Sequence, residues 1–235
     1  NTGNFRYLEI RGTLVAIGTD ANPITFTTDE ASAAQGQTWM GISIKGSQGG
    51  NVQMDRFRLE RSWWGISNDI AQPGVSYNWT NCQFKNNNYS VQLNADMVYD
   101  GCLFQENGVG QAAQILYGSL TANNCQFIDN FCSFTWSNFI SVSNSLFQGN
   151  GNNIVGSPGM VTNCQFIDND FAFAEAFGHT IQNCLFQGNG VAMDNTGNCN
   201  ISNCVFENND VAVRLGDNGI LTNNIINEPI TATTQ

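Results

Sequence analysis

One short motif, Asn-Cys-x-Phe-x-x-Asn, recurs seven times between Asn81 and Asn209. Its second position is held in turn by Cys82, Cys102, Cys125, Ser145, Cys164, Cys184 and Cys204. The Phe two positions later and the Asn five positions later are present in all seven copies, and a degraded eighth copy lies at Asn224. Successive copies of the seven are 19 to 23 residues apart. Repetition in register at this period predicts a solenoid, in which one structural unit stacks on the next.

Residue alternation within each copy indicates short β-strands. Cys and Phe are two positions apart, and a second pair with this spacing follows the Asn, as in Phe171-Ala172-Phe173. Such strands are unstable alone, but stacked turns place identical columns about 4.8 Å apart and bury one continuous core. The Leu-x-x-Leu-x-Leu pattern of leucine-rich repeats is missing, and helical repeats need another period. The sequence therefore predicts an all-β fold, a single-stranded right-handed parallel β-helix (solenoid) with rungs of about 20 residues.

The unbroken Asn column, from Asn87 to Asn209, has a physical explanation at a corner of the coil. Asn tolerates the left-handed backbone conformation, and its side chain bonds backbone groups at a bend. Stacked amides also bond one another along an axis. We therefore expect the Cys and Phe columns to build the core and the Asn column to turn the corners.

The repeats and the segment that precedes them together predict one β-helix domain, residues 1–235. Residues 1–56 are expected to form entry rungs with loops, and residues 57–235 the regular rungs with their Cys, Phe and Asn columns. Placing Phe57 in the Cys column starts the regular rungs one turn before the first Cys.

The same register makes specific predictions for the rung that Phe57 begins. It puts Ser62 in the Asn column and gives Trp64 and Ile66 as the inward-facing pair. The following step to Cys82 is 25 residues, lengthened by a loop at Ala71-Gln72-Pro73-Gly74.

Composition narrows the partners and the compartment. The formal net charge is -11, from 8 basic and 19 acidic residues, so binding to nucleic acid through counterion release is not expected. The chain has no apolar run long enough to span a membrane, and it begins at Asn1 without Met or a signal sequence. Low charge with abundant polar uncharged residues is typical of extracellular repeat proteins. We therefore expect a processed or excised chain from a secreted or cell-surface protein.

The 8 cysteines are interpreted as buried thiols rather than as a disulfide framework. Six occupy one column in which Ser145 takes the remaining place, and a column that accepts Ser is a packing column. Buried Cys behaves as a small hydrophobe. Cys132 and Cys199 lie outside the column, and for them a disulfide stays open.

The repeats from Cys82 to Asn224 resemble the right-handed β-helix region of the pectin-lyase-like superfamily. Four opening segments are similar to the entry rungs of secreted bacterial cell-surface β-helix proteins: Gly12–Ala16, Gly18-Thr19, Pro23–Phe26 and Trp39–Ile42. The Phe-x-x-Asn spacing is also similar to that of polymorphic outer-membrane adhesins, whose Gly-Gly-Ala-Ile motif is absent. The resemblance implies a fold that hosts lyases, hydrolases, adhesins and fibres alike.

Polysaccharide lyase chemistry needs carboxylates that hold Ca²⁺ beside an Arg or Lys that takes a proton from a uronate. Asp129 and Asp168 are two rungs apart, about 10 Å, too far to share one ion through bonds of about 2.5 Å. Asp168 and Asp170 are the best local pair for Ca²⁺, and a solvated corner is the simpler interpretation. We expect no cofactor, with Ca²⁺ as the alternative.

A polygalacturonase-like hydrolase would require Asn-Thr-Asp, Asp-Asp, Gly-His-Gly and Arg-Ile-Lys motifs, and none is complete in this chain. Gly178-His179-Thr180 and Asn195-Thr196-Gly197 are partial matches. His179 is the only histidine, so His-rich metal sites are not expected, and we interpret it as a loop or corner residue. We assign no catalytic residue.

Five of the eight basic residues gather between residues 45 and 85, near two aromatic residues. The candidate ligand-binding residues are Lys45, Arg56, Arg58, Arg61, Trp63, Tyr77 and Lys85. An aromatic ring flanked by Arg can stack on a sugar and pair with its acid group. In the proposed register Glu60 lies beside Lys85, so one charge is neutralised by a neighbour, and a solvated basic face is the simpler alternative.

One further column holds only small residues and is predicted to face outward as a flat strip that packs against a partner. Its members are Ser90, Gly110, Ser133, Asn153, Ala172, Ala192 and Ala212. No helical cap is visible at either end of the repeat, so self-association through the ends or the flat faces is an open alternative.

Together these features predict a non-catalytic, structural or adhesive module that contacts polysaccharide or cell-surface partner chains. Two alternatives stay open: a polysaccharide lyase or glycoside hydrolase of the pectin-lyase-like superfamily, and a subunit of a head-to-tail extracellular filament.

Overall fold

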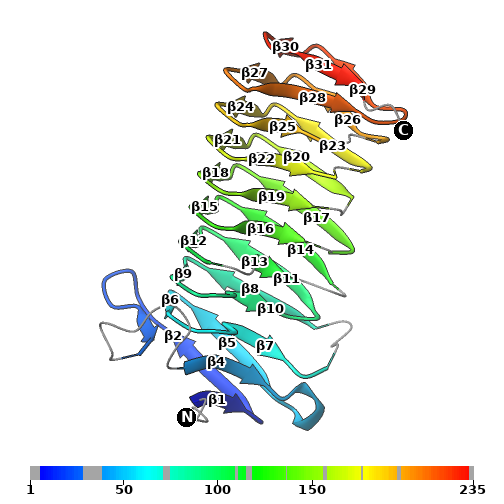
Figure 1. Cartoon of the computed structure of the whole chain (residues 1–235). Coiled ribbons are helices and arrows are strands. Elements are labelled where there is room, and N and C mark those ends of the chain that lie inside the picture. Colours follow the sequence, from blue (N-terminus) through cyan, green and yellow to red (C-terminus); the bar gives the residue numbers. More distant parts are fainter. Residues whose placement is uncertain are drawn as a thin grey trace, which may run out of the picture.

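The computed structural model describes residues 6–28, 39–70, 75–108, 111–114, 118–135, 137–155, 158–175, 177–194 and 197–232. Within these ranges short parallel strands wind into a right-handed β-helix, which confirms the fold predicted from the repeat (Figure 1). The rungs follow one another along a single axis in chain order, so each rung packs on its sequence neighbours. The described part of the chain contains no helix that is long and apolar enough to cross a membrane.

The described strands form three long parallel sheets and one short one. The eleven-stranded sheet consists of β1 (Arg6–Ile10), β4 (Trp39–Ile44), β7 (Ile66–Asn68), β10 (Val91–Gln92), β13 (Gln111–Gln114), β16 (Cys132–Thr135), β19 (Asn152–Val155), β22 (Phe171–Ala174), β25 (Val191–Met193), β28 (Val211–Leu215) and β31 (Ile230–Ala232). The eight-stranded sheet consists of β8 (Ser76–Thr80), β11 (Asp96–Asp100), β14 (Ser119–Asn123), β17 (Phe139–Ser143), β20 (Gly159–Thr162), β23 (His179–Gln182), β26 (Asn200–Ser202) and β29 (Ile220–Thr222).

The ten-stranded sheet carries the Phe column. It consists of β3 (Ile24–Phe26), β6 (Phe57–Glu60), β9 (Gln83–Lys85), β12 (Leu103–Gln105), β15 (Gln126–Ile128), β18 (Leu146–Gln148), β21 (Gln165–Ile167), β24 (Leu185–Gln187), β27 (Val205–Glu207) and β30 (Ile225–Ile226). The short sheet pairs β2 (Thr13–Ile17) with β5 (Asn51–Asp55), and the turn η1 covers Gly46–Gln48. A cavity of about 420 Å³ lies where β5 faces β8, so the sheet is interrupted there.

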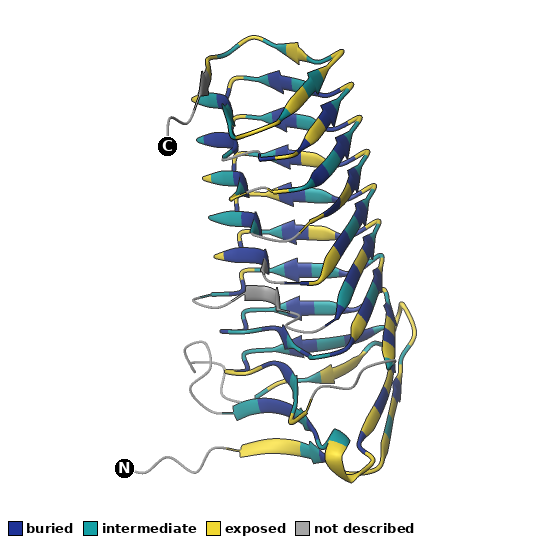
Figure 2. Ribbon diagram, turned by 90° about the vertical axis from the view of Figure 1, so that its right-hand side faces the viewer, coloured by how far each residue is buried: buried dark blue, intermediate teal, exposed yellow. Residues whose placement is uncertain are grey.

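The Phe column forms a continuous stack through the core. Seven rings, from Phe84 to Phe206, are fully buried, and neighbouring centroids are 4.7 to 5.0 Å apart with interplanar angles of 6° to 8°. This separation is the spacing of hydrogen-bonded strands, so strand pairing and ring stacking share one period. Figure 2 shows the same inward positions buried in rung after rung.

The Asn column is a buried chain of amide hydrogen bonds. In each rung, as at Asn150, Nδ2 donates to a Phe carbonyl of the preceding rung (Phe127, 2.8 Å) and to Oδ1 of the next Asn (Asn169, 3.1 Å). Ser62 begins the chain by donating to Asn87 Oδ1, as its predicted register requires. At the other end Asn209 N–H donates to Glu228 Oε1, so a carboxylate takes the place of the next amide.

The expectation that this column adopts the left-handed conformation is wrong. Positive φ values fall instead one residue earlier, at Asn86, Glu106, Asp129, Gly149, Asp168, Gly188 and Asn208. They fall also on the first Asn of the motif, at Asn81, Asn124, Asn144, Asn163, Asn183, Asn203 and Asn223. The residue that makes each bend points outward, which frees the buried Asn to bond within the core.

All eight cysteines are buried and free, which confirms the interpretation of the column and settles Cys132 and Cys199 as thiols. The column thiols donate to nearby carbonyl oxygens, as Cys164 Sγ does to Thr162 O at 3.2 Å. Ser145 makes the same contact to Ser143 O at 2.8 Å, which explains why Ser replaces Cys here.

The first regular rung confirms one half of its predicted inward pair. Residues of β6 pair with β9 so that Phe57 falls in the Cys column, and Ile66 is fully buried. Trp64, however, is 39% exposed and stacks on Tyr89 at 5.2 Å. Gly65, at φ 63°, bends the chain between the two and breaks the alternation that the prediction assumed.

The column of small residues does not face outward, which corrects the predicted flat strip. Its described members, Ser90, Ser133, Asn153, Ala172, Ala192 and Ala212, are fully buried, and Gly110 lies outside the described residues. Both Ala172 and the following Phe173 are buried, so period-two alternation fails at the start of these strands. Small side chains are needed where the chain turns into the eleven-stranded sheet and two neighbours point inward.

Candidate functional site

The residues predicted to form one basic and aromatic patch lie on different surfaces. Arg56 and Arg58 lie at the corner between the eight- and ten-stranded sheets. Lys85 is on the outer face of the ten-stranded sheet, beside Glu60 as expected. Tyr77 is only 2% exposed, so its ring belongs to the core and offers no face to a ligand.

The remaining candidates lie toward the eleven-stranded sheet. Lys45 lines a cavity of about 230 Å³ together with Tyr7 and Trp64. Arg61 is at the far end of β6, where its N–H donates to Lys85 O. Trp63 is 40% exposed. The structure therefore brings together Arg56 and Arg58, and it does not join them to the aromatic residues.

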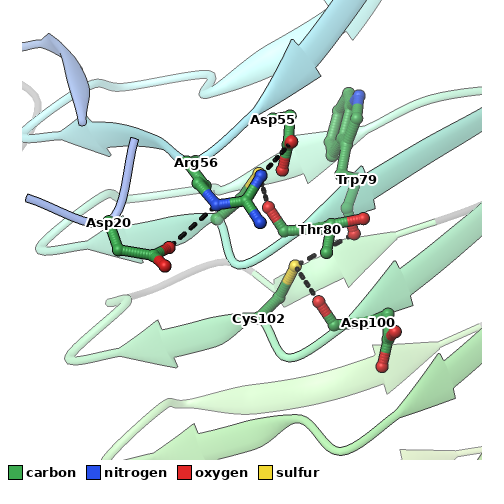
Figure 3. Close-up of polar contacts among 8 residues, drawn as sticks. Asp20, Asp55, Arg56, Trp79, Thr80, Asp100 and Cys102 are labelled. Carbon is green, nitrogen blue, oxygen red and sulfur yellow. Dashed lines mark hydrogen bonds and ion pairs between the residues drawn. The ribbon is translucent and has the colours of Figure 1, made fainter. Parts of the chain in front are cut away.

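Arg56 is held between two carboxylates (Figure 3). Its Nε donates to Asp20 at 2.8 Å, and its Nη1 pairs with Asp55. The hydrogen bond to Asp20 and the charge of Asp55 raise the pKa of Arg56 above its ordinary value. The backbone N–H of Arg56 donates to Thr80 O at 3.0 Å and so ties this residue to the first strand of the eight-stranded sheet. Arg56 thus fixes the turn between β2 and β3 against the corner.

Arg58 projects from the next outward position of β6. Its Nε donates to Gln83 Oε1 at 3.2 Å and lies 3.5 Å from Glu60 Oε1. The side chain is 36% exposed, so it is accessible to a ligand while it is oriented by its neighbours.

A cavity of about 420 Å³ opens at this corner. The turn between β2 and β3, with Asp20 and Pro23, forms one wall, and Arg56, Arg58, Asn81, Gln83, Gly101 and Leu103 complete the lining. Its walls thus combine two guanidinium groups with two side-chain amides.

A second cavity of about 360 Å³ follows on the next rungs of the same corner. Its lining alternates corner asparagines with residues of the ten-stranded sheet: Asn124, Gln126, Asn144, Leu146, Asn163 and Gln165. We call the two cavities together the corner groove. It spans six rungs, from the rung of Arg58 to that of Asn163, or about 24 Å along the axis.

The corner asparagines form an outer row of amides. Asn124 Nδ2 donates to Asp100 Oδ1 at 3.1 Å, and Asn183 Nδ2 donates to Asn163 Oδ1 at 3.3 Å. Asn144 Nδ2 donates to the side chain of the neighbouring position, Asn123, at 2.9 Å. Unlike the buried Asn column, these amides lie at the surface and keep donors and acceptors for a ligand.

Gly101 interrupts the row where the first cavity lies. It has φ 64°, and a Cβ placed on it would lie 2.4 Å from Asn81 Oδ1. The Asn81 side chain therefore occupies the space that a side chain at position 101 would need, and both residues line the cavity.

The acidic residues considered for Ca²⁺ lie at another corner. Asp168 and Asp170 are both exposed, beside the turn from the ten- to the eleven-stranded sheet. Asp168 Oδ1 lies over Gly188, where a Cβ would approach it to 2.3 Å. The described residues contain no group of three or more side chains suited to a metal ion. A Ca²⁺ ion at this pair therefore stays a prediction.

His179 is buried at the start of β23, so the expectation of a loop or corner residue is wrong. The ring is 1% exposed and packs edge-on against Phe173 at 5.4 Å. Neither ring nitrogen has a hydrogen-bond partner among the described residues. Burial lowers the pKa of His179 to about 4, so it is neutral at physiological pH.

The Cys132 thiol is equally unsuited to nucleophilic chemistry. Burial raises the pKa of the Cys132 thiol to about 12, which keeps it protonated. His179 and Cys132 therefore serve packing in the core.

Sequence reasoning missed the corner groove, although the motif contained its signal. The first Asn of Asn-Cys-x-Phe-x-x-Asn lines the groove, while the last Asn is buried in the core. The corner role was predicted for the last Asn, and the first Asn was given no role. The signal was their position relative to the inward Cys, because a residue adjacent to an inward one faces outward.

No family model and no curated protein matches this chain. Among solved structures, a mannuronic acid specific polysaccharide family 6 lyase from human gut microbiota aligns with 88% of this chain at 9% identity and a TM-score of 0.39. The Agl-KA catalytic domain aligns with 99% of it at 12% identity and a TM-score of 0.31. The chain covers 61% and 63% of those two chains, respectively. Likeness at this level carries no argument about activity.

Proposed function

We propose that the protein is a secreted or cell-surface β-helix module that binds a linear polysaccharide along the corner groove without cleaving it. The observation that carries the proposal is the groove itself, which is lined over successive rungs by outward amides such as Asn124, Asn144 and Asn163. Amides both donate and accept hydrogen bonds, which suits a ligand made of hydroxyl groups. Equivalent amides recur once per rung, about 4.8 Å apart, so successive units of a regular polymer can meet equivalent amides.

The charges near the groove favour a largely neutral polymer. The second cavity has no charged residue in its lining, and the protein as a whole is acidic. Leu103 and Leu146 add apolar surface for the C–H faces of sugar rings. Arg58, at one end, is placed to pair with a single acid group on the polymer.

Binding without cleavage is supported by the small number of carboxylates in the groove. Asp20 is the one acidic residue in the two cavity linings, and it is paired with Arg56. Hydrolysis of a glycosidic bond ordinarily uses two carboxyl groups on either side of the bond.

Titration calorimetry of the whole chain with neutral and uronate polysaccharides, with and without Ca²⁺, tests the proposal. We expect Asn144→Ala to weaken binding about tenfold, since two lost hydrogen bonds are worth about 1.4 kcal/mol or more. The matched control is Asn208→Ala, an exposed Asn with the same backbone conformation at the other corner, which should change nothing.

Binding that is equally sensitive to both substitutions would contradict the corner groove. Unsaturated or reducing ends in the same mixtures would instead favour the lyase or hydrolase alternative. The filament alternative stays a prediction and is addressed by the association experiment below.

A further inference from the structure

The outer face of the ten-stranded sheet is uncharged over five consecutive rungs. Its first outward column reads Leu103, Gln126, Leu146, Gln165 and Leu185. The second outward column, two residues further along each strand, reads Gln105, Ile128, Gln148, Ile167 and Gln187. These side chains are half-buried or exposed, and they alternate with the buried Phe column. Rungs with Leu-x-Gln thus alternate with rungs that carry Gln-x-Ile, which makes a checkerboard of apolar and amide side chains.

This checkerboard reads the same in both directions from the rung of Leu146 and Gln148. One rung before it lie Gln126 and Ile128, and one rung after it lie Gln165 and Ile167. Two rungs away, Leu103 with Gln105 matches Leu185 with Gln187 in the same way. The face is therefore symmetric about its own middle rung.

The charges at the two ends of the face are opposite. Three rungs from the middle, the second column ends in Lys85 on one side and in Glu207 on the other. Neither residue has a salt bridge within the described part of the chain, although Glu60 is the strand neighbour of Lys85.

We propose that this face binds the same face of a second copy, with a two-fold axis parallel to the strands through the rung of Leu146. In that arrangement Leu103 meets Leu185, and Lys85 meets Glu207, each pair occurring twice. Apolar side chains contact apolar ones and amides contact amides, as an interface between identical patches requires. The inference does not rest on the proposed function, but Leu103 and Leu146 also line the corner groove, so the dimer and a bound polysaccharide would compete for this face.

Other pairings of two copies lose this match. A two-fold axis along the β-helix would place Leu146 against Gln148 in the same rung and would repeat this mismatch in every rung. A shift of one rung would set each Leu of the first column against a Gln. The opposed Lys85 and Glu207 thus select the antiparallel arrangement in its central register.

The interface is expected to be weak. The face is about 30 Å long and about 10 Å wide, which is smaller than the contact area of a typical stable complex. Asp129 and Asp168 lie two rungs apart at the corner that flanks the face, and in this arrangement they would face each other across the rim. We therefore expect association only at high protein concentration, in the high-micromolar range.

Sedimentation equilibrium of the whole chain over a wide concentration range tests the pairing. Glu207→Lys should weaken dimerisation at least tenfold, because two lysine side chains would then face each other across the interface. The same substitution changes the net charge from -11 to -9, so reduced overall repulsion alone predicts the opposite result. Combining it with Lys85→Glu should restore the dissociation constant to within about threefold of the original.

A second variant tests the axis itself. Leu146→Asp brings two carboxylates together at the two-fold axis and should abolish the dimer, whereas Met160→Asp, an exposed residue on the eight-stranded sheet, should not. Melting temperatures of all variants show whether the fold is retained, and the double charge exchange provides a rescue independent of folding. A chain that stays monomeric at every concentration, forms open-ended polymers, or ignores the charge exchange would overturn the proposal.

Discussion

The entry rungs and the regular rungs of this β-helix are built by different means. In the regular rungs, stacked Phe rings and the buried Asn chain repeat with the strand spacing, and neighbouring rungs are nearly interchangeable. In the entry rungs these columns are missing, and individual contacts hold the chain, such as Arg56 with Asp20 and Arg11 with Glu9. This difference indicates that stability is distributed evenly along the regular rungs, whereas the entry rungs depend on individual side-chain contacts.

Charge also differs along the chain, but its boundary lies later, after Lys85. Residues 1–85 contain seven basic and seven acidic residues and are neutral overall, whereas residues 86–235 contain one basic and 12 acidic residues. The whole net charge of -11 therefore lies in the second part. The corner groove extends across the boundary, with arginines at its first end and uncharged amides along its length.

The Phe column should show the largest difference between the two regions. Phe147→Ala removes a fully buried ring stacked on two others, at 4.8 and 4.7 Å, and should lower the free energy of unfolding by about 4 kcal/mol. Phe26→Ala removes a half-buried ring that contacts Phe57 edge-on at 6.4 Å, and should cost about 1 to 2 kcal/mol. Urea denaturation measures both. Equal costs would mean that the regular stack is no more tightly packed than the entry.

The buried Asn chain should come next. Asn150→Ala removes the two hydrogen bonds that Asn150 donates and the oxygen that accepts two from Asn130. We therefore expect the free energy of unfolding to fall by about 3 kcal/mol. Ser62→Ala, at the start of the chain, leaves Asn87 bonded to Asn107 and should cost about 1 kcal/mol. The same denaturation experiment compares them, and a small effect at Asn150 would show that the amides are replaceable by water.

His179 should make the regular rungs sensitive to acid. Its pKa is about 4 in the fold and 6.5 as the ordinary value, so the unfolded chain binds the proton first as pH falls. The stability contributed by the neutral ring is complete above about pH 6.5 and is lost toward about pH 4. Between about pH 7 and pH 5 the loss should be about 2 kcal/mol. His179→Leu should remove this slope, and an unchanged slope would assign it to other groups.

The smallest effect is expected at the exposed ion pairs of the entry. Arg56→Gln removes partly exposed contacts with Asp20 and Asp55 and should change the free energy of unfolding less than any of the substitutions above. The substitution should nevertheless alter the first cavity, since Arg56 is part of its wall. A large loss of stability would show instead that this pair organises the entry rungs.

The fold could be predicted from the sequence because each column meets its own copy. A Phe that stacks on Phe and an Asn that bonds Asn must recur at the rung period, so the spacing alone gives the register, including Phe57 and Ser62. The prediction failed where alternation is broken by a bend. Gly65 turns Trp64 outward, and the corner before the eleven-stranded sheet buries Ala172 next to Phe173.

The candidate site was harder to predict because neighbours in sequence face different sheets. Lys45, Arg58 and Tyr77 are close in sequence, yet they lie toward the eleven-stranded sheet, at the corner groove and in the core. The groove is instead assembled from residues one rung apart, such as Asn124 and Asn144. Its residues become visible in the sequence only when the outward positions of successive copies are aligned.

Hydrogen–deuterium exchange with the tightest-binding polysaccharide from the calorimetry tests polysaccharide binding at the corner groove most directly. We expect slower exchange in the segments that cross this corner, 78–85, 98–105, 121–128, 141–148 and 160–167, with no change in the eleven-stranded sheet. Slower exchange confined to the eleven-stranded sheet, or no change anywhere at a saturating concentration, would contradict the proposed function.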